Sequence, residues 1–175
     1  ALELPGAGIE APVLVMSYTP VQAIRQAVRQ NITLTVYDLE LARAYDRAAR
    51  DAGGKLRAHV KVDTGMGRLG VLAADAVPFF RHLLSLSHLE IEGIYTHFST
   101  ADEDLTYTVE QLRRFKDVLT PLRAAGFTFK YIHAANSAAT LVSNETHFNA
   151  VRVGLAMYGL SPSDIARVPR TFKPA

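Results

Sequence analysis

The sequence predicts an α/β fold with a parallel, curved sheet. Apolar runs of about five residues alternate with amphipathic helical segments, which is typical of βα units. Two of the expected strands, His59–Asp63 and Ile94–Phe98, carry polar side chains on one face and apolar side chains on the other. An open sheet covered by helices on both faces would be apolar throughout. The pattern therefore favours a TIM-type (β/α) barrel, which has a lined interior and a site at the carboxyl ends of its strands.

The chain is expected to supply about six of the eight strands that close such a barrel. The expected strands are Pro12–Met16, Thr33–Tyr37, Leu56–Asp63, Ile91–Phe98, Phe129–Ala134 and Ala150–Leu155. We expect the other two strands to precede Ala1, so that this chain holds strands three to eight of the (β/α)8 barrel. Residues 1–163 would form this partial barrel domain, and residues 164–175 would form a linker with no core of its own.

Helices are expected between the strands, and local signals mark where they begin. Thr19–Pro20 predicts a helix start with Thr19 as the N-cap, and Asp38 predicts another N-cap. The remaining helices are expected over Ala76–Leu86, Thr108–Ala125 and Ser137–Val142.

The composition excludes several classes of function. The 175 residues include 19 Lys and Arg against 17 Asp and Glu, a net charge of +2 that is too small to indicate a nucleic-acid partner. There is no cysteine, which removes thiolate metal sites and is compatible with a reducing, cytoplasmic compartment. No apolar run reaches the roughly 20 residues of a membrane helix, and the six histidines lack a metal-binding spacing such as H-E-x-x-H. We therefore expect neither a membrane association nor a metal site.

The segment Gly65–Gly70 fits G-x-G-x-x-G after an expected strand and has three interpretations. It could be the fingerprint of a dinucleotide-dependent oxidoreductase, but the negative Asp63 before it and the apolar Val71–Leu72 after it argue against a pyrophosphate site. It could be a turn in which glycine lets the backbone bend. It could also be a loop that presents Arg68, whose planar guanidinium suits a carboxylate.

Two polar side chains lie on the faces expected to point into the barrel. Lys61 either forms a structural pair with Asp63 or, when desolvated, has a lowered pKa and an accessible neutral amine. His97 is either a core histidine with satisfied hydrogen bonds or part of a site.

The last two expected elements add a possible anion site. Asn136–Ser137 opens a short helix, where Ser137 is either an ordinary N-cap or, because helix N-termini attract anions, a phosphate ligand. Arg152 interrupts an apolar strand, and because it keeps its charge when buried it requires partners. Gly154–Leu155 would let backbone N–H groups approach an anion closely, as late barrel strands often do for phosphate.

The polar residues above lie in four segments of the chain. These segments are His59–Gly70, Tyr95–Phe98 with Ala101–Glu103, His133–Ala139 and Val151–Gly159. Together and in this order they resemble the barrel domain of bacterial alanine racemases, over essentially all of this chain but only part of the family's chain. The resemblance implies a pyridoxal phosphate (PLP) enzyme that interconverts L- and D-alanine through an imine with PLP (an aldimine) and two-base transfer of the α-proton. It also implies a homodimer, because the family's C-terminal domain brings a catalytic tyrosine from the other subunit.

The resemblance implies a cofactor role for six residues. Arg152 would hydrogen-bond the pyridine nitrogen of PLP and, because it keeps its proton, would leave that nitrogen unprotonated. His97 and Asn136 would support Arg152. Ser137 and the backbone at Gly154–Leu155 would hold the phosphate.

The remaining implied roles concern the substrate. Arg68 would approach the substrate carboxylate, and Lys61 stands where the family often carries a carbamylated lysine, an anion able to orient Arg68. The PLP lysine and the tyrosine base lie outside this chain, so we expect no catalytic residue in it and no racemisation by it alone. A PLP-binding barrel protein without enzymatic activity is the alternative, but it would be expected to differ over His133–Ala139.

Overall fold

The computed structural model describes residues 1–169 and 171–172. Its strands are β1 (Leu14–Val15), β2 (Thr33–Val36), β3 (Leu56–Asp63), β4 (Val71–Leu72), β5 (Leu89–Tyr95) and β6 (Tyr131–His133). Its α-helices are α1 (Glu3–Gly6), α2 (Ile24–Arg29), α3 (Leu39–Asp51), α4 (Ala76–Leu83), α5 (Leu105–Ala124) and α6 (Ser137–Val142). Its 3-10 helices are η1 (Val21–Ala23), η2 (Ala73–Asp75), η3 (Asn144–Thr146) and η4 (Leu155–Tyr158).

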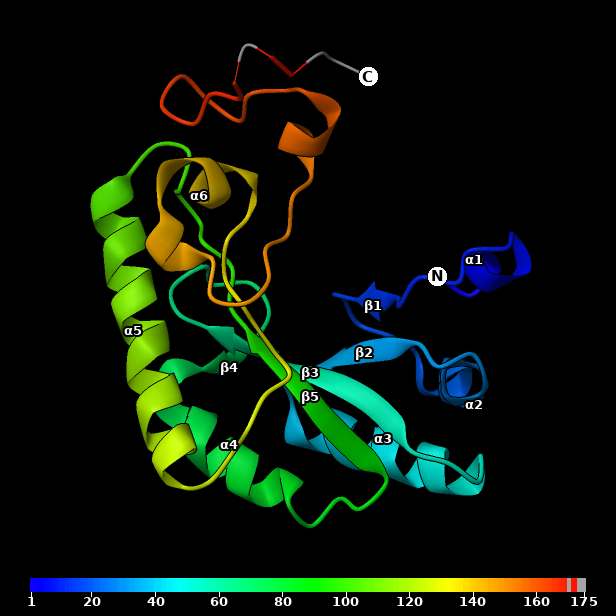
Figure 1. Ribbon diagram of the computed structural model, residues 1–175. Coiled ribbons are helices and arrows are strands. Elements are labelled where there is room, and N and C mark those ends of the chain that lie inside the picture. Colours follow the sequence, from blue (N-terminus) through cyan, green and yellow to red (C-terminus); the bar gives the residue numbers. More distant parts are fainter. Residues whose placement is uncertain (170, 173–175) are drawn as a thin grey trace.

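The strands form one parallel sheet in the order β1-β2-β3-β5-β6, and β4 pairs with the end of β3. The sheet curls as a half-barrel, with the longer helices along its outer side and α6 and the C-terminal segment beyond the carboxyl ends of the strands (Figure 1). The predicted α/β barrel class is thereby confirmed. The numbering of the strands as three to eight stays a prediction.

The outward face of the strands forms the apolar core with the helices. In β3, Leu56, Ala58, Val60 and Val62 are fully buried. They belong to one cluster with helix side chains that include Ala42, Tyr45, Phe80, Leu83, Phe115 and Leu122. Burying one large aliphatic side chain contributes about 1.5–3 kcal/mol, so this face holds the sheet on its helices. The other face, with His59 and Lys61, is left to line the interior.

The sixth expected strand, Ala150–Leu155, is not a strand. Only Ala150 forms a bridge, to His133, and the Arg152 N–H donates to the Ala135 carbonyl at 2.9 Å. The alternating apolar pattern suits a strand, but a strand also needs backbone partners. Among the described residues, no strand lies on the other side of this segment, so the ladder stops at the bridge.

The strand β4 was not expected, and it explains part of the glycine-rich segment. Val71 pairs with Val62 directly after the turn. Gly70 has φ of +137°, and a Cβ there would lie 2.6 Å from the backbone nitrogen of Asp63. Only glycine fits this close approach. Gly70, the last glycine of the motif, therefore lets the chain pass close to β3, so that Val71 can pair with it.

One expected helix cap is confirmed and another is wrong. The Asp38 carboxylate accepts from the Leu41 N–H at 2.8 Å and caps α3. Thr19 caps nothing, since the helical region begins with η1 and Pro20 as its N-cap. The Tyr45 hydroxyl instead accepts from the Thr19 N–H at 3.2 Å and donates to the Thr19 carbonyl, so α3 fixes this backbone from a distance.

The C-terminal segment beyond η4 contains turns up to residue 169 and no further helix or strand. The domain boundary expected after residue 163 stays a prediction, and residues 170 and 173–175 of the expected linker lie outside the described residues. Within residues 1–169 and 171–172, none of the helices combines the length and apolar character that a bilayer-spanning helix requires.

Candidate active site

Polar side chains line the inner face of the sheet. Thr35, His59, Lys61, Tyr95 and His133 are each at most 4% exposed. The parallel register pairs Lys61 with Tyr95, and Tyr95 with His133. Because side chains at such positions lie side by side on the same face of a sheet, β3, β5 and β6 place these three groups in one row. The polar interior that the sequence predicted is therefore present.

Arg152 is the centre of this interior. Its Nη1 donates to Nδ1 of His133 (2.9 Å). Its Nη2 donates to the carbonyls of Thr96 (2.8 Å) and Ala134 (3.0 Å) and to Nδ1 of His97 (3.1 Å). None of these bonds uses the Nε–H. Burial lowers the pKa of Arg152 from its ordinary value to about 10, so the guanidinium remains charged at neutral pH.

The guanidinium determines the tautomers of the surrounding histidines. Because arginine only donates, Nδ1 of His133 must accept, and the proton of His133 lies on Nε2. That Nε2–H then donates to Nδ1 of His59 at 2.9 Å. Burial and then the charge of Arg152 lower the pKa of His133 to about 3 and that of His97 to about 4. All the imidazoles bonded to Arg152 are therefore neutral.

Tyr95 supports the histidine and the arginine from one side. Its ring stacks on His133, with centroids 4.7 Å apart and planes 6° apart, and Cζ of Arg152 lies 5.2 Å from its centroid. Its hydroxyl is 3.0 Å from Oγ1 of Thr35. A cation over an aromatic face is attracted to the ring, so Tyr95 helps to hold the guanidinium in place.

Lys61 is buried without a carboxylate partner. Among the described residues no hydrogen bond or ion pair involves its amine, so the structural pair with Asp63 is not formed. Burial and then the charges of Arg68 and Arg152 lower the pKa of Lys61. The direction of this change agrees with the second interpretation, a desolvated lysine, which stays a prediction.

The Asp63 carboxylate holds the loop that carries Arg68. Its Oδ1 accepts from the N–H groups of Gly65 (2.9 Å) and Met66 (2.8 Å), and its Oδ2 accepts from the Gly67 N–H (2.9 Å). These amides are the ones that a dinucleotide site would offer to pyrophosphate. The oxidoreductase interpretation is therefore not supported. Arg68 is exposed, and its presentation at the barrel mouth stays a prediction.

The start of α6 differs from the sequence prediction in its cap. Asn136 is the N-cap, and its Oδ1 accepts from the Ala139 N–H at 2.9 Å. Ser137 is therefore free of capping, and its Oγ accepts from the N–H groups of Gly154 (2.8 Å) and Ala156 (3.4 Å). This bond joins α6 to the segment after Arg152 and leaves the hydroxyl proton of Ser137 available as a donor.

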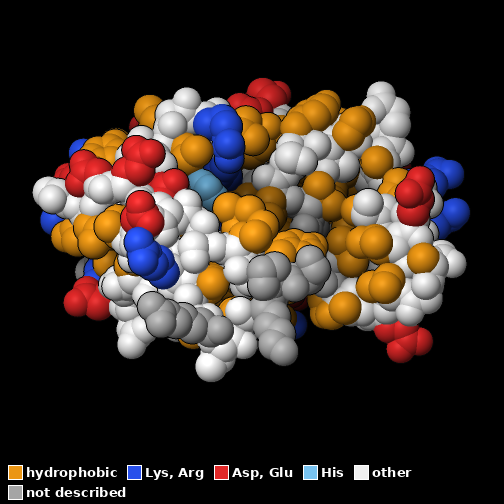
Figure 2. All heavy atoms as spheres, turned by 90° about the horizontal axis from the view of Figure 1, so that it is seen from above, with side chains coloured by type: hydrophobic (Ala, Val, Ile, Leu, Met, Phe, Trp, Pro, Cys, Tyr) orange, Lys and Arg blue, Asp and Glu red, His pale blue; other side chains and the backbone are white. Residues whose placement is uncertain are grey.

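A cavity of about 360 Å³ lies at the carboxyl ends of the strands. Its lining includes all six residues predicted to bind a cofactor: His97, Asn136, Ser137, Arg152, Gly154 and Leu155. Seen from above, the molecule shows a basic side chain and a histidine at a hollow bordered by apolar side chains (Figure 2). Arg68 and Lys61 do not line this cavity.

Part of the site is not predicted from the sequence. His59 has no predicted role, and neither His133 nor Tyr95 is predicted as a site residue. All three residues alternate with apolar residues on expected strands, which is a signal that they face the interior. Their contacts could not be predicted, because these depend on which strands become neighbours. Within the described residues, no group of three or more His, Cys, Asp or Glu is arranged to hold a metal ion.

Comparisons with known proteins agree with this geometry. A family model described as the alanine racemase N-terminal domain matches residues 1–162. The alanine racemase of Methanococcus maripaludis is 44% identical over 172 residues, which cover 97% of this chain and 46% of that protein. The alanine racemase of Carboxydothermus hydrogenoformans is 43% identical and is covered to 48%.

Solved structures give the same result. The alanine racemase from D-cycloserine-producing Streptomyces lavendulae has a TM-score of 0.93 and 35% identity, with 99% of this chain and 47% of that chain covered. The Bacillus anthracis alanine racemase with bound L-Ala-P has a TM-score of 0.90 and 40% identity, with 99% and 46% covered. The chain thus spans about half the length of the relatives that it matches. It belongs to the alanine racemase family and corresponds to that family's N-terminal domain.

Proposed function

We propose that this chain is the cofactor-binding barrel part of an alanine racemase, which interconverts L- and D-alanine with the help of PLP. The observation that carries the proposal is the setting of Arg152, a charged guanidinium held by two neutral histidines and two carbonyls at the cavity. Such a group is a fixed donor without a carboxylate of its own, which suits a neutral acceptor on a ligand.

The residues present fit PLP at both ends of the molecule. The Nε–H of Arg152 takes part in none of the described hydrogen bonds and would donate to the pyridine nitrogen, which would stay unprotonated. The Ser137 hydroxyl and the Leu155 N–H would donate to the phosphate, and Gly154 would orient Ser137 through its 2.8 Å bond. When bound, PLP supplies an electron sink for the pair left at the α-carbon.

Arg68 and Lys61 would act on the substrate side. Arg68 would bind the substrate carboxylate through its guanidinium fork. The neutral amine of Lys61 would add CO₂ and release a proton, and the resulting carbamate would be an anion close to Arg68 and Arg152. This modification explains why a lysine can face two guanidinium groups without repulsion.

The two bases that move the α-proton would come from outside this chain, one of them from a partner subunit of a homodimer. The chain's own contribution is to bind the cofactor and to orient it and the substrate. We therefore predict that residues 1–175 alone do not racemise alanine, whereas the longer protein that carries them does.

The experiment assays both proteins with PLP and L-alanine and measures D-alanine formed. The longer protein should show the visible absorption of bound PLP and should racemise alanine. PLP binding without turnover would favour a PLP-binding barrel protein without activity, and absence of both would refute the proposal. The relatives named above are alanine racemases, which supports the enzyme over that alternative.

A further inference from the structure

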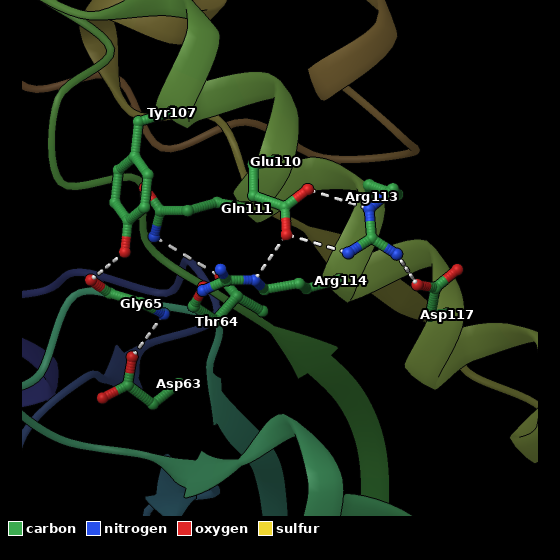
Figure 3. A network of polar contacts seen from close by, with 9 residues as sticks. All are labelled: Asp63, Thr64, Gly65, Tyr107, Glu110, Gln111, Arg113, Arg114 and Asp117. Carbon is green, nitrogen blue, oxygen red and sulfur yellow. Dashed lines mark hydrogen bonds and ion pairs between the residues drawn. The ribbon is translucent and has the colours of Figure 1, made fainter.

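One face of α5 lies against the end of β3. Tyr107, Gln111 and Arg114 are spaced by four and three residues and therefore share this face. The Tyr107 hydroxyl donates to the Gly65 carbonyl (3.0 Å), and Nη1 of Arg114 donates to the Thr64 carbonyl (3.1 Å). Figure 3 shows these side chains reaching from the helix to the loop that follows Asp63.

Gln111 is the buried member of this face, with no exposed surface. Its Oε1 accepts from the N–H (2.9 Å) and the hydroxyl (3.0 Å) of Ser99. Its Nε2 donates to the His97 carbonyl (3.2 Å) and to Oγ1 of Thr64 (3.5 Å). The orientation of the amide is fixed, because the Ser99 N–H can only donate and the His97 carbonyl can only accept.

One side chain therefore joins two segments that the sequence separates. The first leaves β3 at Thr64 and carries Arg68, and the second leaves β5 and carries His97. The two also meet directly through the hydroxyls of Thr64 and Thr96, which are 2.8 Å apart. A hydrogen-bonded amide at this junction limits how far the segments can move relative to each other.

We propose that Gln111 is a positioning residue that fixes the place of Arg68 relative to His97 and Arg152. The inference rests on the proposed function, because Arg68 is there assigned to the substrate carboxylate. The hydrogen bonds of Arg152 do not involve Gln111. Loss of the amide should thus displace Arg68 more than Arg152, which keeps its four hydrogen bonds.

The main variant is Gln111→Met, which keeps the volume of the side chain and removes all four hydrogen bonds. In the longer enzyme we expect KM for alanine to rise between about 10- and 100-fold, with a smaller loss of kcat and an unchanged PLP affinity. Tyr107→Phe removes only the bond to Gly65 and should raise KM about threefold. If the Gln111→Met variant does not fold, Tyr107→Phe still tests whether this face of α5 positions the loop that carries Arg68.

Thr108→Val is the matched control on the same helix. Thr108 is 4% exposed, and its hydroxyl donates to the Asp104 carbonyl (2.9 Å) within that helix region. The control should lower stability slightly and leave KM unchanged. An equal rise of KM in the control, or no rise in Gln111→Met and Tyr107→Phe, would overturn the proposal.

Hydrogen exchange without substrate gives a second measurement. Amides of residues 64–70 and 97–101 should exchange faster in Gln111→Met than in the wild type or in Thr108→Val. This measurement tests the role of Gln111 separately from the proposed function. If the wild-type protein does not racemise alanine, the proposed function is refuted, but the exchange rates still show whether Gln111 holds the two segments together. Unchanged exchange in both segments would refute the role of Gln111.

Discussion

The two ends of the barrel interior differ in whether their charged side chains form ion pairs. At the amino end, Glu92 has partners of opposite charge: Nζ of Lys130 is 3.8 Å from its Oε1, and Nε of Arg57 is 3.9 Å from its Oε2. Thr33 adds a hydrogen bond to the same carboxylate at 2.9 Å. This end is therefore compensated within the chain.

At the carboxyl end the cations are not compensated. Lys61, Arg68 and Arg152 take part in no ion pair among the described residues, and the carboxylate of Asp63 accepts from loop amides instead. Holding buried charge without a counterion costs stability. The difference indicates that paired charge at one end serves the fold, and it agrees with our proposal that the cations at the other end bind a ligand.

The largest effect is expected from Arg152, which makes four hydrogen bonds at the cavity. Arg152→Leu removes the charge and all four hydrogen bonds, so kcat of the longer enzyme should fall about 10²- to 10³-fold. Arg152→Lys keeps the charge but not the planar guanidinium, so its kcat should lie between those of the wild type and Arg152→Leu. Steady-state kinetics and the PLP absorption spectrum measure both variants, and full activity of Arg152→Leu would contradict the assignment.

The neutral histidines predict a pH dependence of stability. The pKa of His59 and His97 is lowered to about 4 and that of His133 to about 3. Below the ordinary value of 6.5 the unfolded chain takes up protons that the folded chain does not, so the free energy of unfolding falls as pH falls from 6.5 toward 4. The slope is at most about 1.4 kcal/mol per pH unit for each group.

Urea unfolding at several pH values measures this slope. His133→Gln removes one of the three groups and should make the slope shallower, with a lower stability at pH 7. The same slope in the variant and the wild type would show that His133 does not bind protons differently in the two states.

A smaller effect is expected from Lys61. If Lys61 is carbamylated, ¹³C-labelled bicarbonate should give a carbamate resonance in the NMR spectrum of the wild type and none in Lys61→Met. The variant should lose roughly tenfold in kcat/KM, because one anionic contact to Arg68 is lost. A resonance of equal intensity in both proteins would place the modification elsewhere.

The smallest effect on activity is expected at the compensated end. Glu92→Gln keeps the shape but weakens the interactions with Arg57 and Lys130, which should cost about 1 kcal/mol of stability. Because Glu92 does not line the cavity at the carboxyl ends of the strands, kcat/KM should stay within about twofold of the wild type. Thermal unfolding together with kinetics tests the comparison, and a large loss of activity without destabilisation would show that both ends act in the reaction.

Much of the architecture could be predicted where the signal is local. The limits of β3 were predicted to the residue, α6 was predicted near its observed place, and Asp38 was correctly identified as a cap. The errors concern contacts between distant segments. Thr19 is fixed by Tyr45 rather than by capping a helix, and Ala150–Leu155 lacks the neighbour that would make it a strand.

The sequence alone determined the order of strands and helices, a polar inner face, and Lys61, His97 and Arg152 as candidate site residues. Only the tertiary structure decided how these groups bond. The contact of His59 with His133 joins residues 74 positions apart, and that of Arg152 with His97 joins residues 55 positions apart. The physical reason is that sheet register and curvature set these distances, and the charged, donor-only guanidinium then fixes each imidazole as neutral.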